Sequence, residues 1–473
     1  MRFRNSAVSV AVAAALSTTS VLAGGENSAN ESMAFGLNGY TVSGPLLTIG
    51  EAFYYTGGDL NPSTAGAYTP PGILDGLGAY ELDKHTVRVF ANHELTFSDG
   101  YPYEVSDGNG GTFSMTGARV SYFDIDKFSK SIVDAGLAYN LIYDANGNVA
   151  TDTSFLPADQ EWDGASGGFT RFCSAVLVDP LEFGGRRDYD DDDKDDWKGW
   201  KGHEASGRGI VDRIYFTGEE TGGDNTGTGG AEWALDVETG DIWAIPAMGR
   251  GAWENITQID TGSRSKVAFI LADDQSPFDA DGDGKEEAAP LYLYVGTKQP
   301  GGNFLERNGL SGGKLYVFVP NNPAKISPAQ FNTAGTLPGN WVEIDNSPTG
   351  PASNDGSTGF DEYGYPTQET LWTRAEELGA FQFSRPEDVA TNPKDGSEAV
   401  LASTGRENEP DLFGTADQFG TVYTIKTNFR NMTAELRIVY DGDAYPTGTL
   451  RSPDNLDWAD DGMIYVQEDK AVS

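Results

Sequence analysis

The sequence predicts an all-β protein and favours a β-propeller, for three reasons. Short stretches of alternating apolar and polar residues recur between turn residues, as half-buried strands do. The chain holds 60 glycines and 23 prolines in 473 residues, and sustained helical periodicity is rare. Residues 384–403 and 451–468 repeat one order: proline, an acid, Asp or Asn, Val or Leu, Asp-Gly, then an apolar strand. A four-stranded unit repeated radially is a propeller blade, although an all-β sandwich also fits the pattern.

Individual strands follow from the same pattern. Residues 79–95 and 119–137 each predict a strand, a turn and a second strand, and residues 233–247 predict a hairpin with Glu-Thr-Gly-Asp as its turn. Further strands are expected at residues 266–273, 290–298, 313–320, 420–427 and 436–443. The best candidate for a helix is the segment 370–381.

The first 23 residues have the layout of a secretory signal peptide. Arg2 and Arg4 precede an apolar run, and a Val-Leu-Ala sequence ends at Ala23. The run is too short to span a bilayer, and no later segment is long and apolar enough to do so. We therefore expect residues 24–473 to form one propeller domain, interrupted by long polar insertions such as residues 180–208, in the periplasm or outside the cell.

The charge of the chain limits its partners. Seventy-two acidic residues against 32 basic ones give a formal net charge of −40, which repels nucleic acids and anionic lipids. Such a balance is typical of solubility or adaptation to salt, and it also suits cation binding. The three histidines, His85, His93 and His203, argue against a three-histidine zinc site, which would need all of them.

A sequence typical of calcium loops lies at residues 279–287, Asp-Ala-Asp-Gly-Asp-Gly-Lys-Glu-Glu. Asp279, Asp281 and Asp283 stand at alternate positions before Gly284, as in the first half of an EF-hand loop. Pro290 occupies the twelfth position, where an EF-hand needs a bidentate glutamate. The segment therefore predicts a looser structural calcium loop, with a solvated acidic turn as the alternative.

Several acids and the only cysteine lie at expected strand ends. Glu387 and Asp454 occupy the same place in the internal repeat, so both should face one mouth of a propeller channel, unless they only cap turns. Oxygen ligands suit Ca²⁺ and Fe³⁺, and a thiolate can join an iron site. Cys173 is a candidate iron ligand on this basis, the alternative being an inert buried thiol. The other candidates are Glu94, Glu219 and Glu220.

Six segments together resemble the PhoX-type alkaline phosphatases and their uncharacterised relatives. They are FANHEL, RFCSA, GEETGG, YVGTKQPGGNFLERNGLSGGKLY, FSRPEDVATNP and SPDNLDW with VQED, between Gly76 and the last residues. The resemblance implies a secreted β-propeller of about six blades that hydrolyses phosphomonoesters with iron and calcium. Relatives continue with at least one more strand, so the resemblance also allows this chain to be a fragment.

The resemblance assigns roles residue by residue. Glu94 matches the acid of an Asn-His-Glu motif, Cys173 a lone iron-ligating cysteine, and Glu219 with Glu220 an acidic pair that binds calcium. Glu387 and Asp454 match channel-facing acids of two later blades. Arg385 and Lys298 fall where cationic contacts to a phosphate would be useful.

The sequence therefore predicts a secreted, monomeric, metal-dependent phosphatase acting on small phosphomonoesters. Arg2 and Arg4 are separated by Phe3, so an ordinary secretory route is expected rather than the twin-arginine export usual in the family. The alternatives are a non-catalytic calcium-binding propeller and a calcium-dependent propeller esterase or lactonase. Iron content separates the first function from the other two, because only the phosphatase needs iron.

Overall fold

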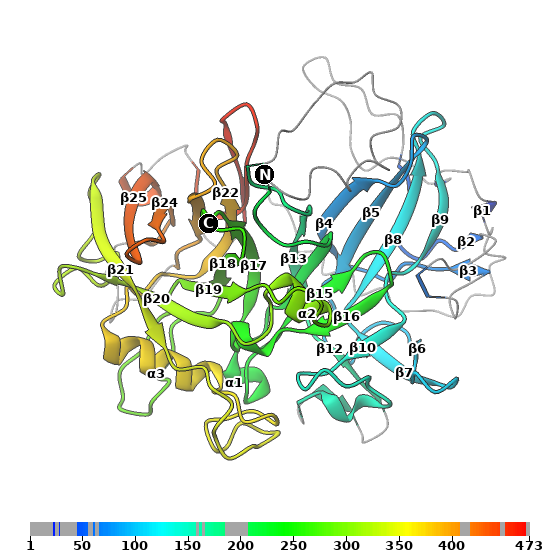
Figure 1. Ribbon diagram of the computed structural model, residues 1–473, viewed down its shortest axis with the longest axis horizontal. Helices are drawn as coiled ribbons and strands as arrows, with labels where there is room; N and C mark the ends of the chain where they lie inside the picture. The colour runs from blue at the N-terminus through cyan, green and yellow to red at the C-terminus, as the bar shows by residue number, and fades with distance from the viewer. Residues whose placement is uncertain are drawn as a thin grey trace, which may run out of the picture.

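Figure 1 shows the computed structural model, in which strands predominate. The residues described are 22–23, 28, 45–54, 60–61, 66–157, 160–162, 166–184, 207–406, 417–444 and 450–469. The expected signal peptide, residues 1–23, lies outside these ranges apart from Leu22–Ala23, and so does most of the 180–208 insertion. A small sheet joins β1 (Leu22–Ala23), β2 (Phe53–Tyr54) and β3 (Ala67–Tyr68).

Two antiparallel sheets of the blade type occupy the first half of the molecule. The first contains β4 (Leu74–Glu81), β5 (Thr86–His93), β8 (Arg119–Asp126) and β9 (Ile132–Leu137), paired in that order. The second contains β13 (Phe172–Val178), β14 (Ile214–Glu219), β15 (Glu232–Asp236) and β16 (Asp241–Ala244), with β10 (Leu141–Tyr143) added in parallel at its outer edge.

The next two blades share one nine-stranded sheet. The third blade contains β17 (Trp253–Ile259), β18 (Lys266–Asp273), β19 (Tyr292–Thr297) and β20 (Lys314–Pro320), followed by β21 (Thr336–Ile344). The fourth contains β22 (Pro386–Thr391), β23 (Glu398–Ser403), β24 (Thr421–Asn428) and β25 (Thr433–Asp441), and β25 pairs with β21. A two-stranded fifth unit holds β26 (Pro453–Trp458) and β27 (Ile464–Glu468).

The first strands of the five units pack against one another in chain order. β4 contacts β13, β13 contacts β17, β17 contacts β22, and β22 contacts β26. In Figure 1 these inner strands run through the middle, and the outer strands of the first and fourth blades lie at opposite sides. The predicted all-β fold and its radial arrangement are confirmed, but the described residues form five such units, and the count of about six is not confirmed.

The cores lie between the blades, and β18 shows why its sequence is apolar throughout. Successive side chains of a strand point to opposite faces. Val267, Phe269 and Leu271 therefore join the core shared with the second blade, while Ala268 and Ile270 join the core shared with the fourth. Both faces of the third blade are covered by neighbouring blades, so the strand expected at residues 266–273 is apolar on both faces. The hairpins expected at 79–95, 119–137 and 233–247 are also present.

The insertions gather where the inner strands begin. Each inner strand runs antiparallel to the second strand of its blade, so the start of one lies beside the end of the other. The connections that leave second strands and those that enter inner strands therefore meet at one end of the channel. These connections contain β6 (Tyr103–Ser106), β7 (Thr112–Gly117), β11 (Glu161–Trp162), β12 (Ser166–Phe169), α1 (Gly223–Thr226) and α3 (Gln368–Leu378).

The remaining helical segments are short. α2 (Phe304–Asn308) lies in the β19–β20 connection, and single 3₁₀ turns span Thr153–Phe155, Pro246–Met248 and Gly442–Ala444. The expected helix at 370–381 is α3, which begins two residues earlier because Thr367 caps it through its side chain. None of the helices in the described part of the chain has the length and apolar character needed to cross a membrane.

Candidate metal centre

Every inner strand carries a β-bulge at the same place. The pairing with the second strand shifts register between the first and fourth residues of each inner strand. A bulge re-aims side chains and is frequent beside functional sites. The second residue of each inner strand is an acid or the cysteine, namely Asp75, Cys173, Glu254, Glu387 and Asp454. The repeat that the sequence shows in two blades thus extends to all five.

A second set of side chains follows the second strands. In each unit, the residue after the second strand donates its backbone N–H to the carbonyl of the residue before the inner strand. Glu94 donates to Ile73 in this way at 2.9 Å, and Glu220 donates to Arg171 at 2.9 Å. This bond places one more side chain per blade beside the bulge. The set consists of Glu94, Glu220, Asp274, Thr404 and Asp469.

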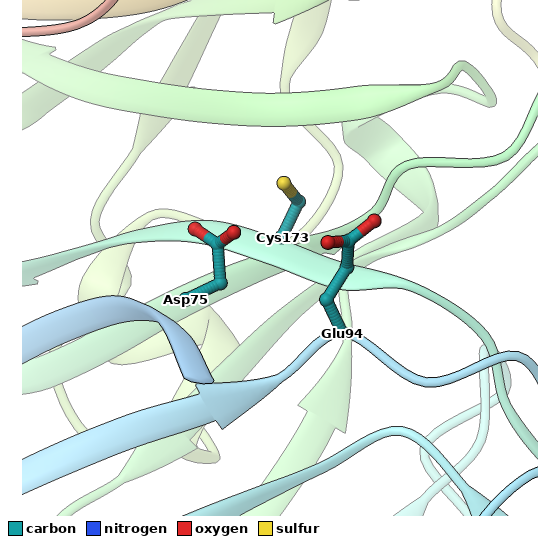
Figure 2. A group of neighbouring side chains, drawn as sticks. All are labelled: Asp75, Glu94 and Cys173. Atoms are coloured by element: carbon teal, nitrogen blue, oxygen red, sulfur yellow. The ribbon is translucent and has the colours of Figure 1, made fainter. Parts of the chain in front are cut away.

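Side chains of the first set, together with Glu94 and Glu220 of the second, form three overlapping groups. Within each group, one ligand atom from every residue lies within 4.8 Å of the others. Figure 2 shows the first group, in which the carboxylates and the sulfur point to the same side of their strands. The groups are Asp75 with Glu94 and Cys173, Cys173 with Glu220 and Glu254, and Glu254 with Glu387 and Asp454. Cys173 and Glu254 each belong to two groups, so the three groups form one continuous metal-centre candidate.

Two arginines border this candidate centre at equivalent positions of the repeat. Arg171 precedes β13 and Arg385 precedes β22, and both have left-handed backbones, with φ of 48° and 58°. Arg385 donates to both carboxylate oxygens of Asp274 at 2.9 and 2.8 Å, and to Glu387 at 2.7 Å. Arg385 therefore lies beside these acids, and its expected contact with a phosphate stays a prediction.

The acids are too crowded to stay ionised without a counter-charge. Burial, followed by the charges of neighbouring carboxylates, raises the pKa of Glu254 well above its ordinary value. The same two causes raise the pKa of Glu220 to about 8 and that of Asp454 to about 7. Converging carboxylates repel one another unless a proton or a cation joins them. Near neutral pH, this arrangement therefore favours cation binding.

Burial and the neighbouring carboxylates also affect the thiol of Cys173. Burial and the carboxylates of Glu254 and Glu220 raise the pKa of Cys173 well above its ordinary value. A thiolate is the form that binds metals. The thiolate of Cys173 therefore needs a cation beside it. A reactive, exposed cysteine differs, because its surroundings lower the pKa of the thiol.

The structure separates the two members of the Glu-Glu pair. Glu220 points into the centre, whereas the buried carboxylate of Glu219 points away and accepts hydrogen bonds from Thr170 N, Ala231 N and Trp233 Nε1 at 3.1–3.3 Å. Adjacent strand residues face opposite sides, so one glutamate alone can join the centre. Glu219 instead fixes the backbone that leads into Arg171 and Cys173, which corrects the expectation of a paired calcium ligand.

Asp273 has the same anchoring role in the third blade. Its buried carboxylate accepts from Ala252 N at 2.8 Å and from Trp372 Nε1 at 2.8 Å. Asp274, the next residue, points to the centre and contacts Arg385. The second and third blades therefore share one arrangement: a carboxylate that holds the backbone, Glu219 or Asp273, is followed by an acid that faces the centre.

Lys298 is not near the centre, contrary to the sequence expectation. It follows β19, and its backbone N–H donates to Ser265 O at 2.8 Å, beside the start of β18. The centre lies beyond the other end of β18, at Asp273, and an eight-residue strand spans about 25 Å. The ammonium group of Lys298 instead donates to Gly209 O at 2.6 Å. Its expected role in phosphate binding is wrong on this topology.

Sequence reasoning missed Asp75, Glu254 and Asp274. The signal was present, because the five inner strands begin LDGL, FCSA, WENI, PEDV and PDNL. Each reads an apolar residue or proline, an acid or cysteine, a small or polar residue, and an apolar residue. Only the last two begin with proline, which is why the repeat was visible in two blades alone.

A buried carboxylate ties three of the bulges together. Asp388, the residue after Glu387, accepts hydrogen bonds from the side chain of Asn255 in the third blade and from Leu456 N, at 2.7 Å, in the fifth. Asn255 follows Glu254, and Leu456 is two residues after Asp454. Asp388 therefore holds the three carboxylates of the all-oxygen group in register, although its own side chain belongs to none of the groups.

The acids that lie together in the expected calcium loop are not the three predicted aspartates. Asp279 and Asp281 lie together with Glu287, with one ligand atom of each within 4.8 Å of the others. Asp283 instead pairs with Lys285 at 2.5 Å. The loop folds back so that Phe278 and Glu287 exchange backbone hydrogen bonds. The three-aspartate ligand set is thus not formed, because an acid from the far side of the turn replaces Asp283.

A cavity of about 1650 Å³ continues from the centre along the channel. The inner strands line it with polar side chains that include Ser174, Asn255, Thr257 and Asn455. It also reaches Lys394 and Asp395, in the turn that follows β22 at the opposite end. The candidate centre therefore lies at the end where the insertions gather, and the channel leads away from it.

Comparison with known proteins identifies the family of the C-terminal half. Residues 242–473 match the family model described as alkaline phosphatase PhoX. The search of curated proteins found no match.

Three solved structures match the chain at low sequence identity. Pseudomonas fluorescens PhoX in complex with vanadate, a transition state analogue, is 15% identical with a TM-score of 0.47, over 84% of this chain and 74% of that one. A calcium structure of a Trichoderma reesei carbohydrate-active enzyme of family AA12 is 9% identical with a TM-score of 0.34, over 89% and 93%. Kuenenia stuttgartiensis hydrazine synthase is 8% identical with a TM-score of 0.28, over 81% and 93%.

Proposed function

This chain belongs to the PhoX alkaline phosphatase family over residues 242–473, and from that premise we propose that it hydrolyses phosphate monoesters at the candidate metal centre. The observation that carries the proposal is the bulge repeated in five inner strands, whose four carboxylates and one thiol belong to one continuous series of overlapping groups. The family match supports phosphatase activity. The specificity for small phosphomonoesters, the metals and the export of the protein are our proposals.

The donor set fits a metal cluster with two kinds of ligand. The groups that contain Cys173 combine sulfur with carboxylate oxygen, which suits Fe³⁺, and they are completed by Asp75, Glu94, Glu220 and Glu254. The group of Glu254 and its two partners offers oxygen alone, which suits Ca²⁺. When bound, such ions supply Lewis-acid chemistry that offsets charge on phosphoryl oxygens and activates a nucleophile.

The protein's own residues position and balance this centre. Arg385 is held by Asp274 and Glu387, so its guanidinium is fixed at the edge of the centre, where it balances carboxylate charge and can donate to a phosphoryl oxygen. Glu219 and Asp273 anchor the backbone on either side of the second and third inner strands. The formal net charge of −40 disfavours polyanionic substrates such as nucleic acids, so a small substrate with few negative charges is favoured.

Purified protein should contain both iron and calcium and should release p-nitrophenol from p-nitrophenyl phosphate. Elemental analysis and a colorimetric assay measure the two properties, with bis(p-nitrophenyl) phosphate as the diester control. We expect turnover of the monoester and little of the diester. Calcium without iron, together with no turnover, would favour the non-catalytic calcium-binding propeller. Turnover of p-nitrophenyl acetate by iron-free protein would favour an esterase.

Calcium removal should lower the thermal stability of the protein. A cation that binds only the folded state adds a free energy of about 2.7 kcal/mol per site when its concentration is a hundred times Kd. The group of Glu254, Glu387 and Asp454 and the loop with Asp279 are the expected sites. Differential scanning calorimetry with and without excess EGTA measures the shift in Tm, and excess Mg²⁺ serves as the ionic-strength control. A Tm that EGTA leaves unchanged argues against both sites.

A further inference from the structure

Arg171 has free hydrogen-bonding capacity at the edge of the candidate metal centre. Both of its ion pairs use the same nitrogen, since Nη2 contacts Glu94 Oε1 at 3.0 Å and also contacts Glu220. Its Nε is buried and has no hydrogen-bond partner among the described residues. A buried N–H without an acceptor is costly, so such a donor points to an acceptor that the described residues do not supply.

The equivalent arginine of the repeat has more of its nitrogen atoms in contact with carboxylates. Arg385 uses Nε and Nη2 on the two oxygens of Asp274, and Nη2 again on Glu387. Its side chain is 20% exposed, whereas that of Arg171 is 41% exposed. The two arginines share a position before an inner strand and a left-handed backbone, so their difference lies in their partners. Of the two, Arg171 has fewer of its donors in contact with carboxylates and the greater access to solvent.

Hydrogen bonds hold the backbone around Arg171 in place. Arg171 N donates to Leu95 O at 2.7 Å, and the preceding residue, Thr170, donates to the anchored carboxylate of Glu219 at 3.1 Å. Its left-handed φ of 48° is a conformation that side-chain-bearing residues rarely adopt, and these contacts maintain it. The guanidinium therefore stands at a fixed point two residues from Cys173.

We propose that Arg171 contacts the phosphoryl oxygens of the substrate and of the inorganic phosphate product. The proposal rests on the proposed function, and it replaces Lys298, which lies beyond the other end of β18. A guanidinium offers N–H groups in a fork that matches phosphate oxygens, and a charge-assisted hydrogen bond is stronger than a neutral one. Cations on Glu94 and Glu220 would take over the charge balance that Arg171 now gives these acids, which leaves its donors to an anion.

Isothermal titration of metal-loaded protein with inorganic phosphate tests this contact without relying on turnover. Arg171→Met should weaken phosphate binding about ten- to a hundredfold, the loss expected for a charged hydrogen bond. Arg171→Lys keeps the charge but not the forked N–H groups, so its affinity for phosphate should lie between those of Arg171→Met and the wild type. Metal content, measured on the same samples, should stay unchanged. Arg213→Met is the matched control, because Arg213 pairs with Asp179 beyond the far ends of β13 and β14.

Three outcomes would overturn the proposal. Unchanged phosphate affinity in both Arg171 variants with full metal content would make Arg171 only a partner of the carboxylates. Loss of metal in proportion to loss of phosphate binding would assign it the same indirect role. Wild-type protein that holds its metals and binds no phosphate would also refute the contact. Arg171-dependent phosphate binding without any turnover would support the contact and refute the proposed catalytic function instead.

Discussion

Glu254→Gln should lose metal from two of the three groups at once and should abolish phosphatase activity. Glu254 is shared by the group with Cys173 and Glu220 and by the group with Glu387 and Asp454. An amide keeps the size of the side chain but offers one neutral oxygen in place of a carboxylate. Altered groups outside the ligand shell already cost 10–100-fold in metal affinity or activity. We expect at least about a hundredfold loss of activity here.

Without metals, the Glu254→Gln variant should nevertheless be at least as stable as the wild type. Burial and the charges of Glu220 and Glu387 raise the pKa of Glu254 well above its ordinary value. A group whose pKa is raised by folding contributes stability that is lost as the pH rises toward the folded-state pKa. The metal-free wild type should therefore lose stability with rising pH, and Glu254→Gln should lose less because the amide does not ionise.

Elemental analysis and the Tm with and without metals measure both halves of this prediction. Glu238→Gln is the matched control, since Glu238 is exposed in the β15–β16 turn and should change neither quantity. A Glu254 variant that keeps full iron and calcium would remove Glu254 from the centre. A variant that is less stable than the wild type without metals would show that the carboxyl group serves folding rather than cation binding.

The internal repeat explains how far the sequence could predict this centre. Glu387 and Asp454 were found because proline, acid and a following Asp-Gly turn mark both strands. Glu254 follows a tryptophan, in WENI, and no comparable turn follows it. The feature common to all five strands is a register shift in strand pairing. That shift is a property of the backbone hydrogen bonds with the next strand, so a single sequence shows no clear residue pattern for it.

Orientation and distance were the other unpredictable elements. Glu219 and Glu220 are equivalent in a motif, but the alternation of a strand turns one toward buried N–H groups and the other toward the centre. Lys298 lies in a segment that resembles the family, yet the chain direction of β19 carries it away from the acids. The fold class was predictable because short strands repeat along the chain. The choice between neighbouring residues needed the structure.

Cys173→Ser should remove iron and phosphatase activity together while leaving the fold intact. Serine is close to cysteine in shape, so the loss of packing is small. Its hydroxyl is far less acidic than a thiol and a harder ligand, so it replaces a thiolate poorly at neutral pH. Cys173 belongs to both sulfur-containing groups, so its loss affects Asp75, Glu94 and Glu220 as well. Calcium on the all-oxygen group of Glu254, Glu387 and Asp454 should be retained.

Ser174→Ala provides the matched control for this substitution. Ser174 is the next residue of the same bulge and lines the channel cavity, but it belongs to none of the metal-binding groups. Its variant should keep iron, calcium and turnover of p-nitrophenyl phosphate. An inert cysteine predicts a different result for Cys173→Ser, namely slight destabilisation with an unchanged metal content. If the variant retains full iron and full activity, the thiol is not a ligand, and the centre must be assigned to the carboxylates alone.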